Sequence, residues 1–125
     1  MGKLKEETVL KNEKKHNCQT IASSLNGKNI LYGTKVMKLH AGVYWLYNNL
    51  VLTLFDPEEG PFANITVNIE DLPVDEFAVD TNNFPEAGKI LRQNHLAVPT
   101  DKLLHSGYCV YPVYKLTLED FFKED

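Results

Sequence analysis

The stretch GTKVMKLHAGVYWLYNNLVLTLFD, residues 33–56, decides the fold, because its apolar residues follow the period of β-strands. Residues 43–47 and 50–55 flank Asn48 and Asn49, and asparagine tolerates the positive φ of a tight hairpin turn. The sequence therefore predicts a β-hairpin centred on this asparagine pair. Tyr, Trp, Leu and Val occupy both alternating sets of positions, which predicts apolar neighbours on both faces.

Upstream of the hairpin, the sequence predicts one short helix over residues 18–25. Ile21, Ala22 and Leu25 fall at helical spacing, and Asn26-Gly27 follows as a stop signal. Residues 1–15 carry few large apolar side chains and much charge, so we expect a disordered segment or a frayed helix there. Residues 16–125 are expected to form a single α+β domain.

Downstream of the hairpin, the turn DPEEGP leads into a predicted strand over residues 62–69. Ile65, Val67 and Ile69 alternate with small polar residues in this stretch. Such alternation is typical of a strand with one buried face and one wet face.

The stretch FAVDTNNFPEAG, residues 77–88, joins an apolar run to a predicted helix over 84–96, with Pro85 in the first turn. Two roles are open for its polar residues Asp80, Asn82 and Asn83. They can bond the free backbone donors at the helix start, with Asn82 or Asn83 as N-cap, which stabilises a helix by about 1 kcal/mol. Alternatively, they face a ligand.

The C-terminal part contains a connection, AVPTDKLLHSG (97–107), then a strand in YCVYPVYKLTL whose Pro112 indicates an edge or a bulge. From Thr117 a last short helix is predicted, with Leu118, Phe121 and Phe122 at helical spacing. The predicted fold is α+β: a small, mainly antiparallel sheet of four to five strands with two to three short helices packed on it.

The bulk composition fits one globular domain, since 125 residues are 43% hydrophobic and 24% charged. The apolar runs are far shorter than a membrane helix needs, and the lysine-rich start lacks a secretory leader. We therefore expect a cytoplasmic protein without membrane contact. Cys18 and Cys109 are expected to be free thiols in a reducing compartment.

The charge pattern is more informative than the net charge of −4. Residues 50–88 contain no Lys or Arg. They contain nine acids: Asp56, Glu58, Glu59, Glu70, Asp71, Asp75, Glu76, Asp80 and Glu86. The N-terminal lysines alternate with glutamates, so the chain lacks the coherent basic face that direct nucleic-acid binding requires. The acidic block instead favours a basic protein or ribonucleoprotein partner.

Catalytic and metal-binding patterns are weak. Cys109 with His105 or His95 and a nearby Asn or Asp has the residue types of a Cys-His-Asn set, but a thiol in an aromatic strand is usually inert. His16 with Cys18, and His95 with His105, lack metal-ligand spacing. We expect no catalytic residue, no metal site and no cofactor.

A band of aromatic residues can form either the core and rim of a sheet or a binding face. Its members are Tyr44, Trp45, Tyr47, Tyr108, Tyr111 and Tyr114.

The segments YNNLVLTLFDPEEGPFANITVNI, FAVDTNN and HSGYCVYPVYKL resemble a family of small proteins of unknown function from low-GC Gram-positive bacteria and their mobile elements. The resemblance covers approximately residues 43–117. The residues that carry it are Asp80, Thr81, Asn82, Asn83, Gly107, Tyr108, Cys109, Tyr111 and Pro112. It implies a mobile-element context and no defined mechanism.

The expected function is a non-enzymatic interaction protein that binds a basic macromolecule. An inhibitor of a host defence nuclease, such as an anti-CRISPR or antirestriction protein, is its specific form. The candidate binding residues are Asp80, Asn82, Asn83, His105, Tyr108, Tyr111, Glu58 and Glu59. Two alternatives are a small hydrolase or ligand-binding domain centred on Asp80, Asn82, Asn83, His105 and Cys109, and a homodimer joined through the Tyr-Pro strand.

Overall fold

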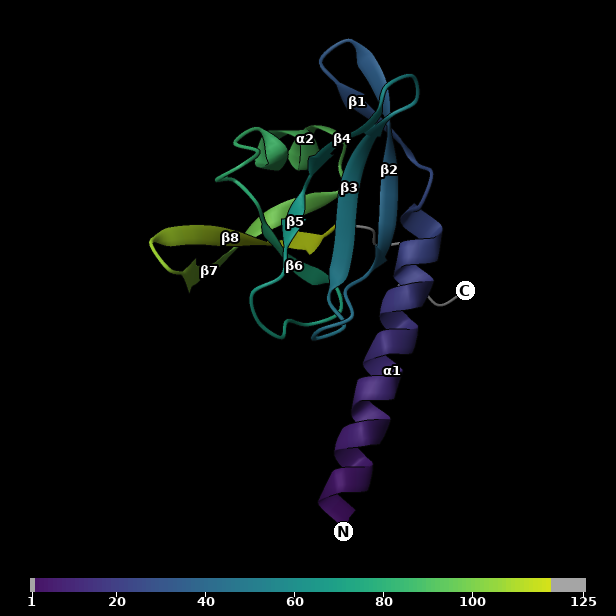
Figure 1. The fold of residues 1–125 in the computed structure, drawn as a ribbon, viewed down its shortest axis with the longest axis vertical. Coiled ribbons are helices and arrows are strands. Elements are labelled where there is room, and N and C mark those ends of the chain that lie inside the picture. Colours follow the sequence, from purple (N-terminus) through teal and green to yellow (C-terminus); the bar gives the residue numbers. More distant parts are fainter. Residues whose placement is uncertain (1, 118–125) are drawn as a thin grey trace.

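Two helices and two four-stranded antiparallel sheets make up the structure, a computed structural model that describes residues 2–117, with side chains from residue 9 onward (Figure 1). The first sheet has the order β1-β2-β3-β4, with β1 (Asn29–Tyr32), β2 (Lys35–Val43), β3 (Leu50–Asp56) and β4 (Gly60–Asn64). The second has the order β5-β6-β8-β7, with β5 (Thr66–Val67), β6 (Glu76–Val79), β7 (Ala97–Ser106) and β8 (Cys109–Leu116). The helices are α1 (Gly2–Leu25) and α2 (Ala87–Gln93).

The α+β class is confirmed, whereas the single sheet of four to five strands is wrong. The predicted strand over 62–69 is divided at Ile65, where the chain passes from the first sheet to the second. Ile65 donates its N–H to the Leu52 carbonyl, and its own carbonyl accepts the N–H of Asp80. The expected wet face is also interrupted, because Thr66 is buried and its Oγ1 accepts the N–H of Leu52.

The main core lies between the two sheets and receives side chains from both helices. It contains Ile21 of α1, Leu52 of β3, Phe77 of β6 and Ile90 of α2. A second, smaller cluster covers the other face of the second sheet and contains Leu72, Ala78, Leu104, Tyr111 and Val113. Because both faces of β6 are covered, all four of its residues are buried.

Helix α1 begins at Gly2, whereas we expected a disordered or frayed segment over 1–15 and a helix only from 18. Cys18, Ile21, Ala22 and Leu25 are buried, so its C-terminal turns pack into the core, mainly against β2. Figure 1 shows the N-terminal half extending away from the sheets. Helical propensity alone rarely holds such a segment in water, so tertiary contacts near its middle matter.

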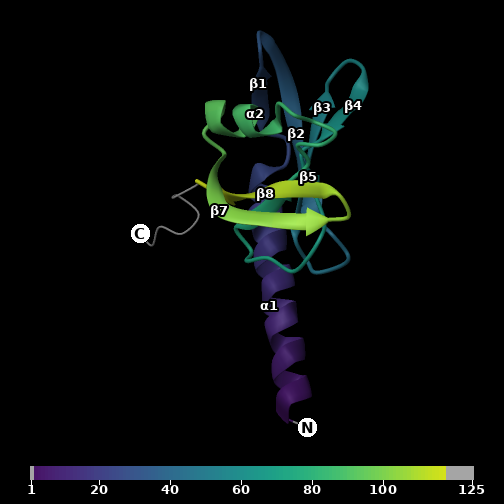
Figure 2. The ribbon, with the colours of Figure 1, turned by 90° about the vertical axis from the view of Figure 1, so that its left-hand side faces the viewer.

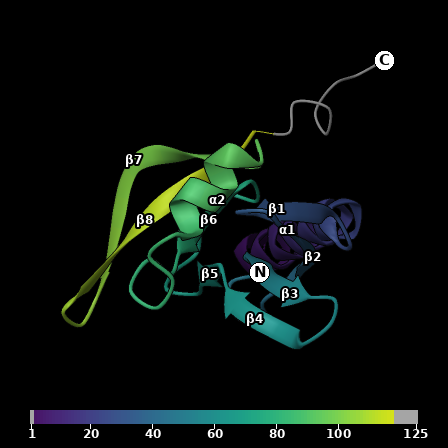
Figure 3. The same cartoon turned by 90° about the horizontal axis from the view of Figure 1, so that it is seen from above.

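The segment 97–106, expected to be a connection, is the ten-residue strand β7. With β8 it forms a hairpin that runs across the direction of α1 (Figure 2) and extends beyond the rest of the second sheet (Figure 3). A register irregularity lies between Pro99 and Leu103, where the Thr100 hydroxyl donates to the Val113 carbonyl. β8 pairs with β6 only as far as Val113, so Pro112 lies where that ladder ends and its missing N–H leaves no partner unpaired.

Helix α2 is shorter than the predicted helix over 84–96, and the helix predicted from Thr117 lies outside the described residues. Neither described helix combines the length and the apolar character that crossing a bilayer requires.

Candidate functional site

The β2–β3 connection, residues 44–49, is here named the Trp45 loop. The predicted hairpin is confirmed, but its first strand ends at Val43 and not at Tyr47. Tyr47 has φ 67° and Asn48 has φ 56°, so the left-handed pair is one residue earlier than the predicted Asn48-Asn49 turn. A tyrosine in this conformation costs roughly 1 kcal/mol or more, which the surrounding contacts must offset.

Asn49 supplies those contacts and is buried, with 4% of its surface exposed. Its Oδ1 accepts from Lys14 Nζ at 2.9 Å and from the Leu72 N–H at 3.1 Å. Its Nδ2 donates to Asn68 Oδ1 at 2.9 Å and to the Glu70 carbonyl at 2.7 Å. The side chain is therefore fully used in tying the Trp45 loop to residues 68–72.

Lys14 joins helix α1 to the same network. Its Nζ donates to the Tyr47 carbonyl at 2.7 Å, to Asn49 and to Asp71. Only 19% of its side chain is exposed. The Lys14 ammonium thus bonds three acceptors, two in the Trp45 loop and one at Asp71, and the position of the Trp45 loop depends on it. The sequence pattern had predicted a disordered segment or a frayed helix at this residue.

The outer residues of the Trp45 loop face solvent. Trp45 is 94% exposed, and Leu46 and Tyr47 are also exposed. The Leu46 carbonyl accepts from Asn68 Nδ2 at 3.0 Å. Tyr44 points inward, where burial raises the pKa of its hydroxyl, which bonds Thr66. The Trp45 side chain thus projects into solvent from a loop whose backbone carbonyls are held by Lys14 and Asn68.

The aromatic band of the sequence is divided by the fold. Tyr111 and Tyr114 are core residues, and Tyr108 is exposed at the tip of the β7–β8 hairpin. The sequence thus singled out Trp45 and Tyr47 as aromatic candidates but missed Asn49 and Lys14, which hold them. The Asn48-Asn49 pair signalled a turn, and no sequence signal marks Lys14.

The predicted residues Asp80 and Asn83 lie together in a turn before α2. Asp80 is buried, its Oδ1 accepts the Asn83 N–H at 3.3 Å and its Oδ2 accepts Asn83 Nδ2 at 3.0 Å. Asn82 is exposed beside them. The predicted N-cap at Asn82 or Asn83 is wrong, because Glu86 is the N-cap and makes no side-chain cap bond. The hydrogen bonds between Asp80 and Asn83 thus close a turn that ends three residues before the N-cap Glu86.

His105 and Cys109 do not converge. Cross-strand partners share one face of a sheet, and Ser106 pairs with Cys109 while His105 pairs with Val110 on the opposite face. Tyr111 lies on the Cys109 side, where a hydrogen bond with Cys109 raises the pKa of the tyrosine. The Cys-His-Asn arrangement is therefore not assembled. Among the described residues, no group of three or more His, Cys, Asp or Glu side chains could hold a metal ion.

Lysines from elsewhere in the chain pair with much of the acidic block. The pairs are Asp56 with Lys35 at 2.6 Å, Asp71 with Lys14, Asp75 with Lys115 at 3.7 Å and Glu76 with Lys102 at 2.8 Å. The candidates Glu58 and Glu59 are exposed in the turn between β3 and β4. The nine acids of the sequence thus do not form one uncompensated surface.

The pair of Asp56 and Lys35 predicts a specific pH response. The hydrogen bond from Lys35, followed by that from the Glu58 N–H, lowers the pKa of Asp56 below its ordinary 3.8. A lowered folded-state pKa gives stability that is present above pH 3.8 and lost as the pH falls through the folded value. We expect the urea midpoint of the wild type to fall more between about pH 6 and about pH 3 than that of Asp56→Asn. Lys35→Met should flatten the response similarly, and equal slopes in all three proteins would contradict the assignment.

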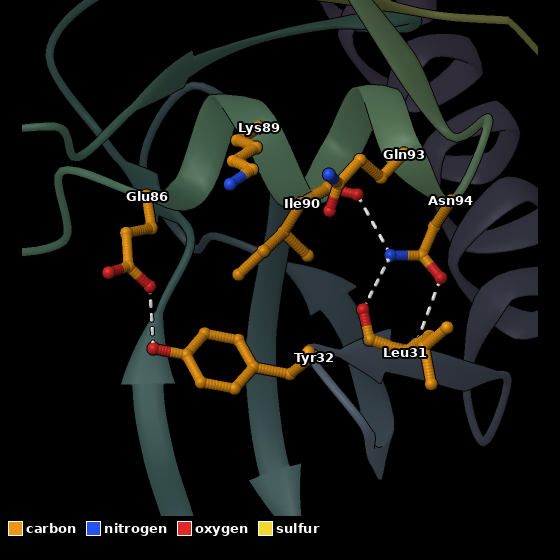
Figure 4. A pocket seen from close by; sticks show the side chains of 8 residues that line it. Leu31, Tyr32, Glu86, Lys89, Ile90, Gln93 and Asn94 are labelled. Carbon is orange, nitrogen blue, oxygen red and sulfur yellow. Dashed lines mark hydrogen bonds between the residues drawn. The ribbon is translucent and has the colours of Figure 1, made fainter.

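A hollow of about 480 Å³ lies between α2 and the end of β1 (Figure 4). Several of its polar groups bond within the lining: Tyr32 Oη donates to Glu86 at 2.6 Å, which raises the pKa of Tyr32. Asn94 accepts the Leu31 N–H at 2.9 Å and donates to the Leu31 carbonyl at 3.0 Å. The Asn94 side chain thus pairs with the backbone of the edge strand β1 as a neighbouring strand would. We interpret the hollow as the place where α2 packs on the first sheet.

Comparisons with known proteins give one family. The model of a family described as Domain of unknown function (DUF4313) matches residues 38–124, from within β2 onward. No curated protein and no solved structure matches the chain. The match covers the Trp45 loop, both sheets from β2 onward and α2, but not Lys14. This chain belongs to the DUF4313 family.

Proposed function

We propose that this protein is a non-enzymatic interaction module that presents the Trp45 loop to a protein partner. The observation that carries the proposal is a tryptophan that is 94% exposed on a loop fixed by the hydrogen bonds of the buried Asn49 side chain. Because Trp45 is exposed, it makes no core contact that would offset the cost of the left-handed backbone at Tyr47. Strain that is held by the surrounding structure concentrates at functional sites.

Two physical arguments support a protein as the partner. Tryptophan and tyrosine dominate the binding energy of protein interfaces, because they bury much area with few rotatable bonds. A loop that is already ordered loses little conformational entropy on binding. Exposed charges of both signs lie nearby, including Asp71 and Lys15, as in the polar rim of such interfaces.

A basic partner is the more specific form of this proposal, with a defence nuclease blocked by a mobile-element protein as its narrowest form. Its support is the acidic turn of Glu58 and Glu59 together with the charge of −4. The lysine pairs of the other acids reduce the available negative surface. Partner binding that weakens steeply with added salt would support this form, and so would weaker binding by the double variant Glu58→Gln, Glu59→Gln. Salt-independent binding would mean that the Trp45 loop alone provides the binding energy.

Trp45→Ala should leave the melting temperature unchanged but weaken partner binding at least about tenfold, because the side chain is exposed in the free protein and buried in the complex. The measurement is quantitative capture from a lysate of the native host by tagged wild type, Trp45→Ala and Leu103→Ala. Leu103 is the matched control, since it is an exposed apolar residue on β7 and is not among the candidate binding residues. Equal capture by all three proteins, or capture of nothing by the wild type, would refute the proposal.

A further inference from the structure

The packing face of α1 continues beyond the body of the protein. Helical periodicity places Leu10, Lys11 and Lys14 on the face that also carries Cys18 and Ile21. Cys18 and Ile21 are buried against the core, but Leu10 is 63% exposed. A helix of 24 residues is about 36 Å long. Its described side chains ahead of Lys14, those of residues 9–13, are all exposed.

The Trp45 loop lies beside the point where this free face begins. Lys14 Nζ bonds the Tyr47 carbonyl and Asn49, and Leu10 lies one helical turn nearer the N-terminus on the same side. Figure 1 shows the β2–β3 connection level with the middle of α1 and the rest of the helix continuing past it. Exposed side chains of the loop and of the helix therefore lie on neighbouring segments of the surface.

Charge and shape select the kind of partner. Lys11 and Lys15 are exposed at i, i+4 on one side of α1, while Lys14 is already paired with Asp71. The surface thus combines one side of a helix with an aromatic loop. A helix laid beside α1 can bury an apolar stripe against Leu10 and Trp45 and place acids against the two lysines.

We infer that the Trp45 loop and residues 9–15 of α1 form one docking surface for an amphipathic helix of a partner protein, with acidic residues flanking its apolar stripe. This inference rests on the proposed function of the Trp45 loop and gives that loop an acidic partner, as an alternative to the basic partner that the Glu58 and Glu59 turn favours. Lys14 is a positioning residue in it, because its ammonium fixes the Trp45 loop relative to the helix.

The single tryptophan of the chain makes the test direct, since all tryptophan emission comes from Trp45. The probes are two tryptophan-free peptides of about three heptads, with Leu and Ile at a and d and either Glu or Lys at e and g. The full-length protein is titrated with each. The glutamate peptide should shift the emission to shorter wavelength with saturation, and the lysine peptide should bind at least about tenfold more weakly.

Variants separate the parts of the surface. Leu10→Glu should weaken binding of the glutamate peptide at least about tenfold, and so should the double variant Lys11→Glu, Lys15→Glu. The double variant should also bind the lysine peptide more tightly than the wild type does. Val98→Glu is the matched control, an exposed apolar residue on β7, and should change nothing. Lys14→Met should weaken binding and also alter the emission of the free protein, which a residue acting only through its charge would not do.

Equal affinity for both peptides, or no emission change with either, would overturn the inference. So would an emission shift that grows with protein concentration alone, because a second copy would then occupy the surface. If capture from the lysate depends on Trp45 but the glutamate peptide fails, the helical partner is wrong and the proposed function stands.

Discussion

Asn49→Ala should lower the free energy of unfolding by about 3 kcal/mol, because it removes four hydrogen bonds and leaves the buried Leu72 N–H without this acceptor. A buried donor left unpaired costs about 1–3 kcal/mol, and the loss of the three partly buried bonds adds to that cost. The left-handed Tyr47 also loses part of its support. Urea titration followed by far-UV circular dichroism measures the change.

Two further variants make this result specific. Asn64→Ala removes one exposed hydrogen bond of 3.4 Å to Thr53 and should change stability by less than about 0.5 kcal/mol. Asn49→Asp keeps the shape but turns a carboxylate toward the Glu70 carbonyl, so it should destabilise at neutral pH and less at acidic pH. A loss below about 1 kcal/mol for Asn49→Ala would mean that water replaces its bonds.

Gly88→Ala should destabilise the protein by about 2 kcal/mol, although alanine is the better helix former. A β-carbon on Gly88 would lie 2.2 Å from Tyr114 Oη and 3.1 Å from Tyr114 Cζ. Tyr114 is buried in the main core, so its ring has little room to withdraw. The clash between α2 and β8 therefore outweighs the gain in helix propensity.

A double-mutant cycle tests this clash. Tyr114→Phe removes the hydroxyl that the new methyl would meet, so Gly88→Ala in that background should lose most of its cost. Gly42→Ala is the control, because a β-carbon there would meet nothing within 4 Å. Equal costs of Gly88→Ala with and without the Tyr114 hydroxyl would place the cause in the backbone of α2 instead.

Local patterns predicted those features that depend on neighbouring residues. The hairpin around residues 48 and 49 follows from alternation and two asparagines, and the burial of Ile21 and Leu25 follows from helical spacing. The strand β7 was missed because Pro99, Thr100 and Asp101 read as a turn. In the structure they lie at a bulge on an edge strand, where a missing N–H is harmless.

The candidate site was predicted in part, for a related reason. Trp45 and Tyr47 stood out by type, but a period of two assigned them to a strand. Their exposure follows from bonds between residues far apart in sequence, such as Lys14 and Asp71, which are 57 positions apart. Spacing rules describe only residues a few positions apart, so they carry no information about such pairs.

The sequence by itself determined the α+β class, the presence of the β2–β3 hairpin and the apolar face of residues 21–25, because period and side-chain size act locally. The tertiary structure alone decided that the strands separate into two sheets at Ile65, that lysines pair with four of the nine acids of the block, and that Lys14 fixes the Trp45 loop. The physical reason is that ion pairs and buried hydrogen bonds need distance and direction. Only the folded chain sets both for residues that lie far apart in sequence.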